Sequence, residues 1–203
     1  MPAILTRMRG AAVELRRDAR GLAATEFAMI VPLMLLLFFG TTEISTGVAI
    51  DRKVTLVAHT LSDLTSRSLC VEYTGCDTLT NFFAASYGIM WPYSSTPVNA
   101  TISELYIDPK TSLARVQWSQ GSAPRSTGST MTIPSGLIAT DSSGNVLSNQ
   151  YLIFSEVSYL YKPAIGYVVA PAGITLKDTS YTRPRQLACV HYQEVQSNPC
   201  PTK

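Results

Sequence analysis

Residues 21–40 read GLAATEFAMIVPLMLLLFFG, and the segments on either side are interpreted by their position relative to this apolar run. The apolar part, Leu22 to Gly40, is 19 residues long, close to the ~20 that a helix needs to cross a bilayer. Pro32 lies inside it and predicts a kink, because proline removes one backbone hydrogen bond. An ionised carboxylate in such a segment costs several kcal/mol unless it is paired, so Glu26 is a candidate functional residue.

The charges on either side of this stretch predict its orientation. Five arginines precede Leu22 against two carboxylates, whereas the rest of the chain has 11 basic and 12 acidic residues, a net of −1. Arginine-rich flanks stay in the cytoplasm, so residues 1–21 are expected inside the cell and residues 69–203 outside. The arginine cluster also resembles a nucleic-acid-binding segment, but it lacks interleaved aromatic residues, and we expect no nucleic-acid partner. A cleaved secretory signal is the weaker interpretation because no small-x-small site follows the apolar run.

The helix is expected to continue beyond the membrane. Apolar residues recur at helical spacing through Ile50, Val54, Val57, Leu61 and Leu64, with charged residues between them. The pattern ends near residue 68, which predicts one helix over 22–68: a membrane span at 22–40 and an amphipathic stalk. Such a stripe packs on its own domain, on a partner subunit, or on each along part of its length.

Residues 69–203 are rich in Ser, Thr, Gly, Pro and Tyr, with short alternating runs that predict strands. The clearest is Tyr151 to Tyr161, dense in aromatic and β-branched residues and ended by Lys162-Pro163. The fold class is therefore α+β: a long amino-terminal helix packed on a carboxy-terminal antiparallel sheet. A short helix is expected over 84–90. The other predicted strands are 100–107 and 113–118 (a hairpin), 131–133, 167–170, 174–176 with 179–182, and 187–192.

Four cysteines, Cys70, Cys76, Cys189 and Cys200, lie on the expected outer side of the membrane. An even number in an oxidising compartment indicates two disulfides. Three pairings are possible, and we favour Cys70 with Cys76 and Cys189 with Cys200, since each closes a short polar loop. A zinc site is the rival interpretation, but the spacing is not CxxC and two scattered histidines do not complete it, so no metal is expected.

No catalytic constellation is present in the sequence, and we expect neither enzymatic activity nor a cofactor. The segment Asp141 to Asn145 resembles the start of a DxSxS adhesion site, but Asn145 replaces the second serine and a solvated turn is favoured. Glu156 lies within the strongest strand. It is expected at an exposed edge or paired with an arginine such as Arg183 or Arg185, which are themselves interpreted as a charged edge that discourages sheet pairing.

The run GLAATEF, followed by AMIVPLMLLL, resembles the processing site of type IV prepilins of the Flp and Tad class. Residues 24–37 are similar to the amino terminus of TadE-like proteins of the tight-adherence pilus system. Glu43, the strand at Glu156-Val157-Ser158-Tyr159 and the segment Arg183-Pro184-Arg185 add a looser similarity.

The resemblance implies that an inner-membrane prepilin peptidase cuts between Gly21 and Leu22, with Glu26 and Phe27 at the fifth and sixth mature positions. It further implies that Glu26 pairs with the new amino group on Leu22 of a neighbouring subunit. A chain with 130 or so residues after the helix departs from the short Flp major pilin and fits a minor pilin or pseudopilin that initiates or caps a pilus.

The partners implied are the peptidase, the Flp pilin, other minor pseudopilins, the inner-membrane assembly platform and membrane lipid. The implied location is the bacterial inner membrane, single-pass with a periplasmic domain, and then the extracellular pilus. Two alternatives stay open. One is a pseudopilin of a secretion system, and the other is a single-span periplasmic binding protein in which Glu26 is incidental.

Overall fold

The computed structural model describes residues 20–163, 172–193 and 200. Residues 1–19 of the predicted leader and the predicted strand at 167–170 lie outside the described residues. The chain divides into two compact units, residues 1–45 and 46–203, and helix α2 (Arg20–Ser66) contributes to both.

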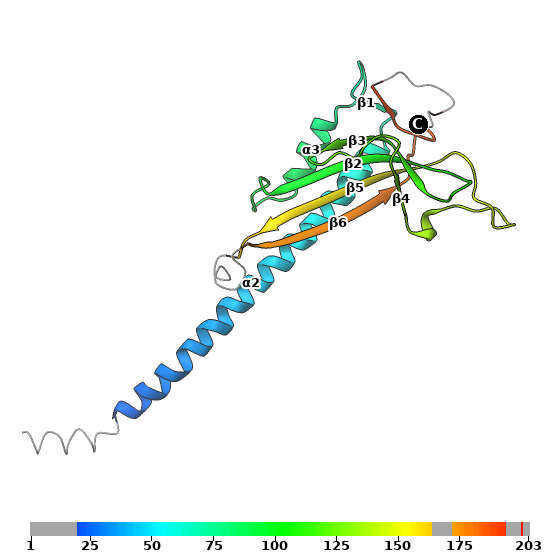
Figure 1. Ribbon diagram of the computed structural model, residues 1–203. Helices are drawn as coiled ribbons and strands as arrows, with labels where there is room; N and C mark the ends of the chain where they lie inside the picture. Colours follow the sequence, from blue (N-terminus) through cyan, green and yellow to red (C-terminus); the bar gives the residue numbers. More distant parts are fainter. Residues whose placement is uncertain (1–19, 164–171, 194–199, 201–203) are drawn as a thin grey trace, which may run out of the picture. The chain divides into compact units, whose positions relative to one another are not determined.

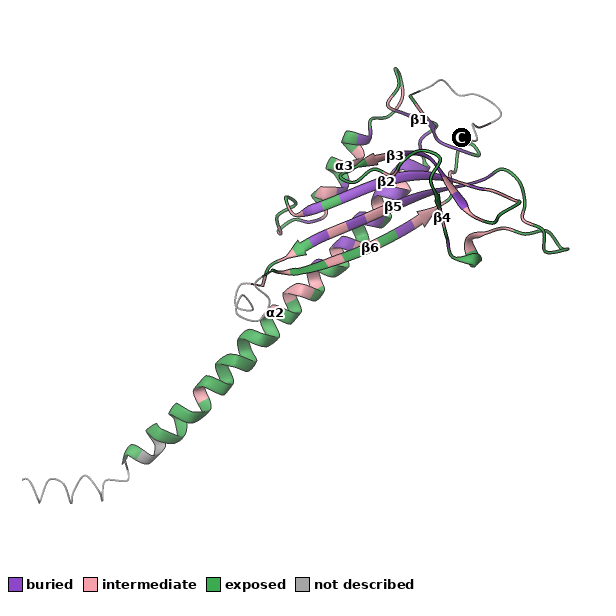
Figure 2. Ribbon diagram, viewed as in Figure 1, coloured by how far each residue is buried: buried purple, intermediate pink, exposed green. Residues whose placement is uncertain are grey.

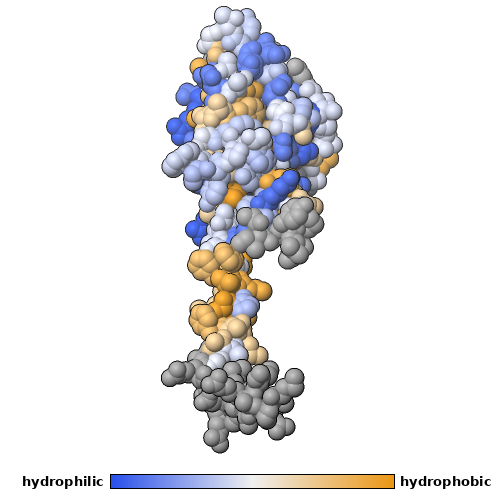
Figure 3. Space-filling model, turned by 90° about the vertical axis from the view of Figure 1, so that its left-hand side faces the viewer, coloured by the Kyte–Doolittle hydropathy of each residue, from blue (hydrophilic) through white to orange (hydrophobic). Residues whose placement is uncertain are grey.

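Helix α2 is 47 residues long and joins the apolar run to the amphipathic stripe without a break, which confirms the single helix expected from the sequence. It includes Pro32; the kink itself stays a prediction. In the first unit the apolar side chains from Phe27 to Phe39 lie largely exposed (Figure 2). Figure 3 shows hydrophobic residues gathered on this part of the helix. In length and composition it is the one helix of the described chain that could cross a membrane.

The second unit is built around a five-stranded antiparallel sheet of order β4-β3-β2-β5-β6 (Figure 1). The predicted hairpin is β2 and β3, joined by a turn in which the backbone N–H of Lys110 donates to the Asp108 carboxylate. A bulge between Glu104 and Leu105 shifts the register with β3. The strands are β2 (Val98–Ile107), β3 (Ala114–Gly121), β4 (Thr130–Met131), β5 (Gln150–Tyr161) and β6 (Ile174–Thr182).

The amphipathic stripe of α2 packs on one face of this sheet. Ile50, Val54, Val57 and Leu61 are buried in one core with alternate residues of the strands, so the stripe docks on its own domain. Small polar groups add contacts across the interface: the Ser155 hydroxyl donates to the carbonyl oxygen of Ala58 at 2.6 Å. The sheet residues in this core are Val98, Ala100, Ile102, Trp118, Ile153, Val157 and Tyr159.

A second core lies on the opposite face of the sheet, because successive strand residues point to opposite sides. Leu152 and Phe154 of β5 belong to it, whereas Ile153 between them belongs to the first core. The segment that follows β4, including the short helix η1 (Ser135–Leu137), contributes Ile133 and Leu137 to this core. Both faces of the sheet therefore carry buried apolar residues.

The structure differs from the predicted elements in several places. The short helix α3 (Leu79–Gly88) begins five residues earlier than expected, and the two predicted pieces near residue 178 form one strand, β6. The strand predicted at 187–192 is reduced to β7 (His191–Tyr192), and 131–133 is replaced by β4. β7 pairs in parallel with β1 (Cys70–Val71), so the domain is not wholly antiparallel.

Candidate processing site and carboxy-terminal cluster

The residues of the predicted processing site lie in the first turns of α2. Glu26 is exposed, and Phe27 is 67 % exposed. A Cβ built on Gly21 would meet nothing within 4 Å. Nothing is described for the side chain of Leu22. Glu26 is therefore placed where a second molecule could reach it.

The two predicted disulfides are present. Cys70 bonds to Cys76 with Cα atoms 5.4 Å apart, and Cys189 bonds to Cys200 with Cα atoms 6.0 Å apart. Both pairings match the local arrangement favoured from the loop lengths. The second bond attaches Cys200, near the end of the chain, to the segment that leads into β7.

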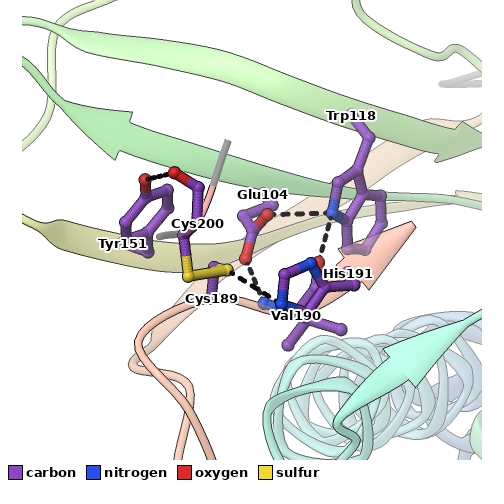
Figure 4. Close-up of a disulfide and its surroundings, with 7 residues drawn as sticks. All are labelled: Glu104, Trp118, Tyr151, Cys189, Val190, His191 and Cys200. Atoms are coloured by element: carbon purple, nitrogen blue, oxygen red, sulfur yellow. Dashed lines mark hydrogen bonds between the residues drawn. A yellow bond between two sulfur atoms is a disulfide. The ribbon is translucent and has the colours of Figure 1, made fainter. Parts of the chain in front are cut away.

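A buried carboxyl group of the sheet, that of Glu104 on β2, contacts the segment around β7 (Figure 4). The backbone N–H of Val190 donates to Glu104 Oε1 at 2.6 Å, and Trp118 Nε1 donates to Oε2 at 3.0 Å. Trp118 Nε1 also lies 2.9 Å from the carbonyl oxygen of Val190. These three bonds join β2, β3 and the carboxy-terminal arm.

Burial raises the pKa of Glu104 to about 8, although the hydrogen bonds from Val190 and Trp118 act in the opposite direction. Desolvation dominates because the side chain is only 2 % exposed, and an ion is costly in so dry a place. The carboxyl group is therefore protonated at neutral pH.

A cavity of about 380 Å³ adjoins Glu104 and is lined by β3 and the arm. The rings of Trp118 and Tyr192 stack with centroids 5.5 Å apart, and Gln120 Nε2 donates to the Tyr192 hydroxyl at 2.5 Å. His191 also lines the cavity. Its side chain is 1 % exposed, its Nε2 lies 3.7 Å from Cys189 Sγ, and its Nδ1 has no hydrogen-bond partner within the described part of the chain.

Comparison with known families concerns the amino-terminal segment. The family model described as TadE-like protein matches residues 21–60. This segment is similar to TadE-like proteins. It contains Gly21, Glu26, the apolar run and the stripe as far as Val57, and most of the sheet domain lies outside it. No curated protein and no solved structure matches the chain.

The arginine expected to pair with Glu156 was wrongly assigned. Glu156 binds Arg125, with Nε at 2.7 Å and Nη2 at 2.6 Å from its two oxygens. Arg185 instead pairs with Asp63 on α2, so Arg183 and Arg185 do not form a purely repulsive edge. Arg125 lies in the loop after β3, and local sequence spacing does not show that this loop folds over β5.

The segment that resembles an adhesion motif is an exposed turn, as expected. Asp141 Oδ1 accepts the backbone N–H groups of Ser143 and Asn145, at 2.8 and 2.9 Å. Hydrogen bonds from the side chain and backbone of Asn145 lower the pKa of Asp141. Its carboxylate oxygens are used to close the turn.

Sequence reasoning missed the cluster around Glu104. Alternation along the predicted strand 100–107 places Glu104 on the same face as Ala100 and Ile102, which is the face that packs on the helix. A carboxyl group on a buried strand face requires hydrogen-bond partners, so the sequence could have indicated Glu104 as a candidate site residue. The partners Trp118 and Val190 are 14 and 86 residues away and were not visible locally.

Proposed function

We propose that the chain is a minor pilin or pseudopilin that initiates or caps a pilus of the tight-adherence type, after cleavage between Gly21 and Leu22. The observation that carries the proposal is the TadE-like match over residues 21–60. It begins at the residue before the predicted cut and continues through Glu26 and the exposed apolar run. The family match supports an association with pilus assembly, and the specific role is our inference.

Cleavage would change the energetics of the amino-terminal helix. An unpaired carboxylate within a membrane helix costs about 3 kcal/mol or more. Removal of residues 1–21 creates an α-ammonium group on Leu22, and in a second subunit this group could pair with Glu26. Pairing offsets the desolvation cost only in an assembly, so processing would favour assembly.

The sheet domain supports a role in low copy number. The helix stripe that could pack on neighbouring subunits is instead buried on its own sheet at Ile50, Val54, Val57 and Leu61. This leaves the exposed apolar segment before residue 45 for contacts with other subunits and lipid. We propose as partners a prepilin peptidase, an Flp-type major pilin, other minor subunits and an inner-membrane platform.

The cut site is tested by expression with a prepilin peptidase. Gly21→Leu should block processing, and Gly40→Leu is the matched control, since both glycines lie in α2 with open space around a built Cβ. We expect the control to be processed like the wild type. Equal processing of all three chains would refute the assigned cut site.

The pairing role of Glu26 is tested separately by pilus assembly and by cross-linking between subunits. Glu26→Gln should leave the chain in the membrane fraction and reduce assembly. A double variant, Thr25→Glu with Glu26→Gln, keeps the charge but turns it by about 100° around the helix. It should fail as Glu26→Gln does, and full assembly by this variant would rule out a specific pair.

A further inference from the structure

His191, which lies between Cys189 and Cys200 in the sequence, has few hydrogen-bond partners in the disulfide-bonded structure. His191 is almost wholly buried, its Nδ1 has no hydrogen-bond partner among the described residues, and its Nε2 lies 3.7 Å from the sulfur of Cys189. A buried polar group without a partner is destabilising, so an imidazole here requires an explanation.

Local geometry places three metal-ligand atoms together. His191 is the first residue of β7, and Cys189 lies two residues before it with its Sγ 3.7 Å from His191 Nε2. The sulfurs of Cys189 and Cys200 and a ring nitrogen of His191 all lie within 4.8 Å of one another. Figure 4 shows the histidine ring beside the sulfur pair.

The separation of nitrogen and sulfur fits tetrahedral zinc. Zn–S bonds of about 2.3 Å and Zn–N bonds of about 2.0–2.1 Å at tetrahedral angles put the two ligand atoms about 3.6 Å apart. The distance from His191 Nε2 to Cys189 Sγ is 3.7 Å. Cys200 is half-buried, and His191 lines the cavity beside Glu104.

We propose that reduction of the Cys189–Cys200 disulfide creates a Zn²⁺ site whose protein ligands are Cys189, Cys200 and His191. The disulfide and the zinc ion are alternative ways of joining Cys200 to the segment that leads into β7. Zinc would occupy the site only in the reduced state, because a sulfur in a disulfide is not a thiolate ligand.

The reaction balances with a dithiol as reductant. The dithiol gives two electrons and two protons, its own sulfurs join in a disulfide, and the Cys189–Cys200 bond is replaced by two S–H groups. Both thiols then release their protons as Zn²⁺ binds, while the imidazole binds in its neutral form. Three protein ligands leave one position for water.

Spacing along the chain argued against zinc, because it does not show that the fold brings Cys189, His191 and Cys200 together. The other disulfide, Cys70–Cys76, is an internal control, since no such cluster of described ligand residues surrounds it. Reduction of that pair alone should create no zinc site of this kind. The proposal is independent of the pilus role.

The test uses the full chain in detergent, reduced with dithiothreitol, freed of it by gel filtration under nitrogen, and titrated with Zn²⁺ against a chromophoric chelator. The reduced chain should bind one tight equivalent, and the oxidised chain none. The double variant Cys70→Ser, Cys76→Ser should bind like the reduced wild type. His191→Ala should bind Zn²⁺ at least about tenfold more weakly. Mutating a residue that only hydrogen-bonds to a metal ligand already lowers metal affinity about 10- to 100-fold, and His191 is proposed as a ligand itself.

Cobalt substitution gives a second measurement that does not depend on how His191→Ala folds. Co²⁺ in the reduced Cys70→Ser, Cys76→Ser variant should show thiolate-to-metal charge-transfer absorption. Failure of the reduced wild type to bind a tight equivalent would overturn the proposal. Loss of the site in the Cys70→Ser, Cys76→Ser variant would also overturn it, as would full retention in a folded His191→Ala chain.

Discussion

The buried carboxyl group of Glu104 should make the domain less stable as pH rises, in contrast to most paired carboxylates. Its pKa is about 8 in the folded chain against an ordinary value of 4.5. Between these values the folded state keeps a proton that the unfolded state has released, so raising the pH favours unfolding. The stabilisation is complete below pH 4.5 and is lost as pH rises toward 8.

The size of the effect follows from these two pKa values. A shift of one pKa unit corresponds to about 1.4 kcal/mol. Integrated from pH 5.5 to pH 8.0, the linkage relation gives a loss of about 3 kcal/mol in the free energy of unfolding. For a domain of this size, that lowers the midpoint of thermal unfolding by about 6–12 °C.

The assay is thermal unfolding of the oxidised full chain in detergent at both pH values, for the wild type and for Glu104→Gln. Glutamine does not titrate, so the variant reports the pH dependence of the domain without Glu104. It should lose about 1–3 kcal/mol at pH 5.5, because one amide oxygen cannot accept from both Val190 and Trp118. A wild-type loss no larger than that of Glu104→Gln would refute the reasoning.

Three further predictions, one of them with a matched control, are tested by thermal unfolding of the same preparation. Leu61→Ala should cost about 2–5 kcal/mol because Leu61 is fully buried in the first core, whereas Leu56→Ala, at a 52 % exposed position of the same helix, should stay within about 0.5 kcal/mol. Gly121→Ala should cost at least about 1–3 kcal/mol, since the backbone has φ +133° and the new Cβ would lie within 3 Å of the Ala100 carbonyl oxygen. Glu156→Gln should cost only about 0–1 kcal/mol, because it and Arg125 are each about a third exposed; a larger loss would contradict this view of the pair.

The sequence predicted those parts of the fold that depend on local pattern. The stripe through Ile50, Val54, Val57 and Leu61 predicted both the helix and its buried face, and all four residues lie in one core. The aromatic and β-branched run predicted β5 to within one residue. Loop length predicted both disulfides.

The remainder depends on contacts between distant segments. The parallel pairing of β7 with β1 joins residues near 70 and 191, and no local pattern indicates it. The pairing of Arg125 with Glu156, and the hydrogen bonds that Glu104 accepts from Val190 and Trp118, also join residues far apart in the sequence. The sequence could have flagged Glu104 as a buried carboxyl group, but not the groups that bind it.

Amino-terminal sequencing of the mature protein tests most directly the proposal that this chain, whose residues 21–60 match the TadE-like family model, is processed before it assembles. The chain would be expressed with a prepilin peptidase and purified from the membrane. We expect a mature sequence that begins Leu22-Ala23-Ala24-Thr25-Glu26. Retention of residues 1–21, or a new amino terminus at any other residue, would contradict it.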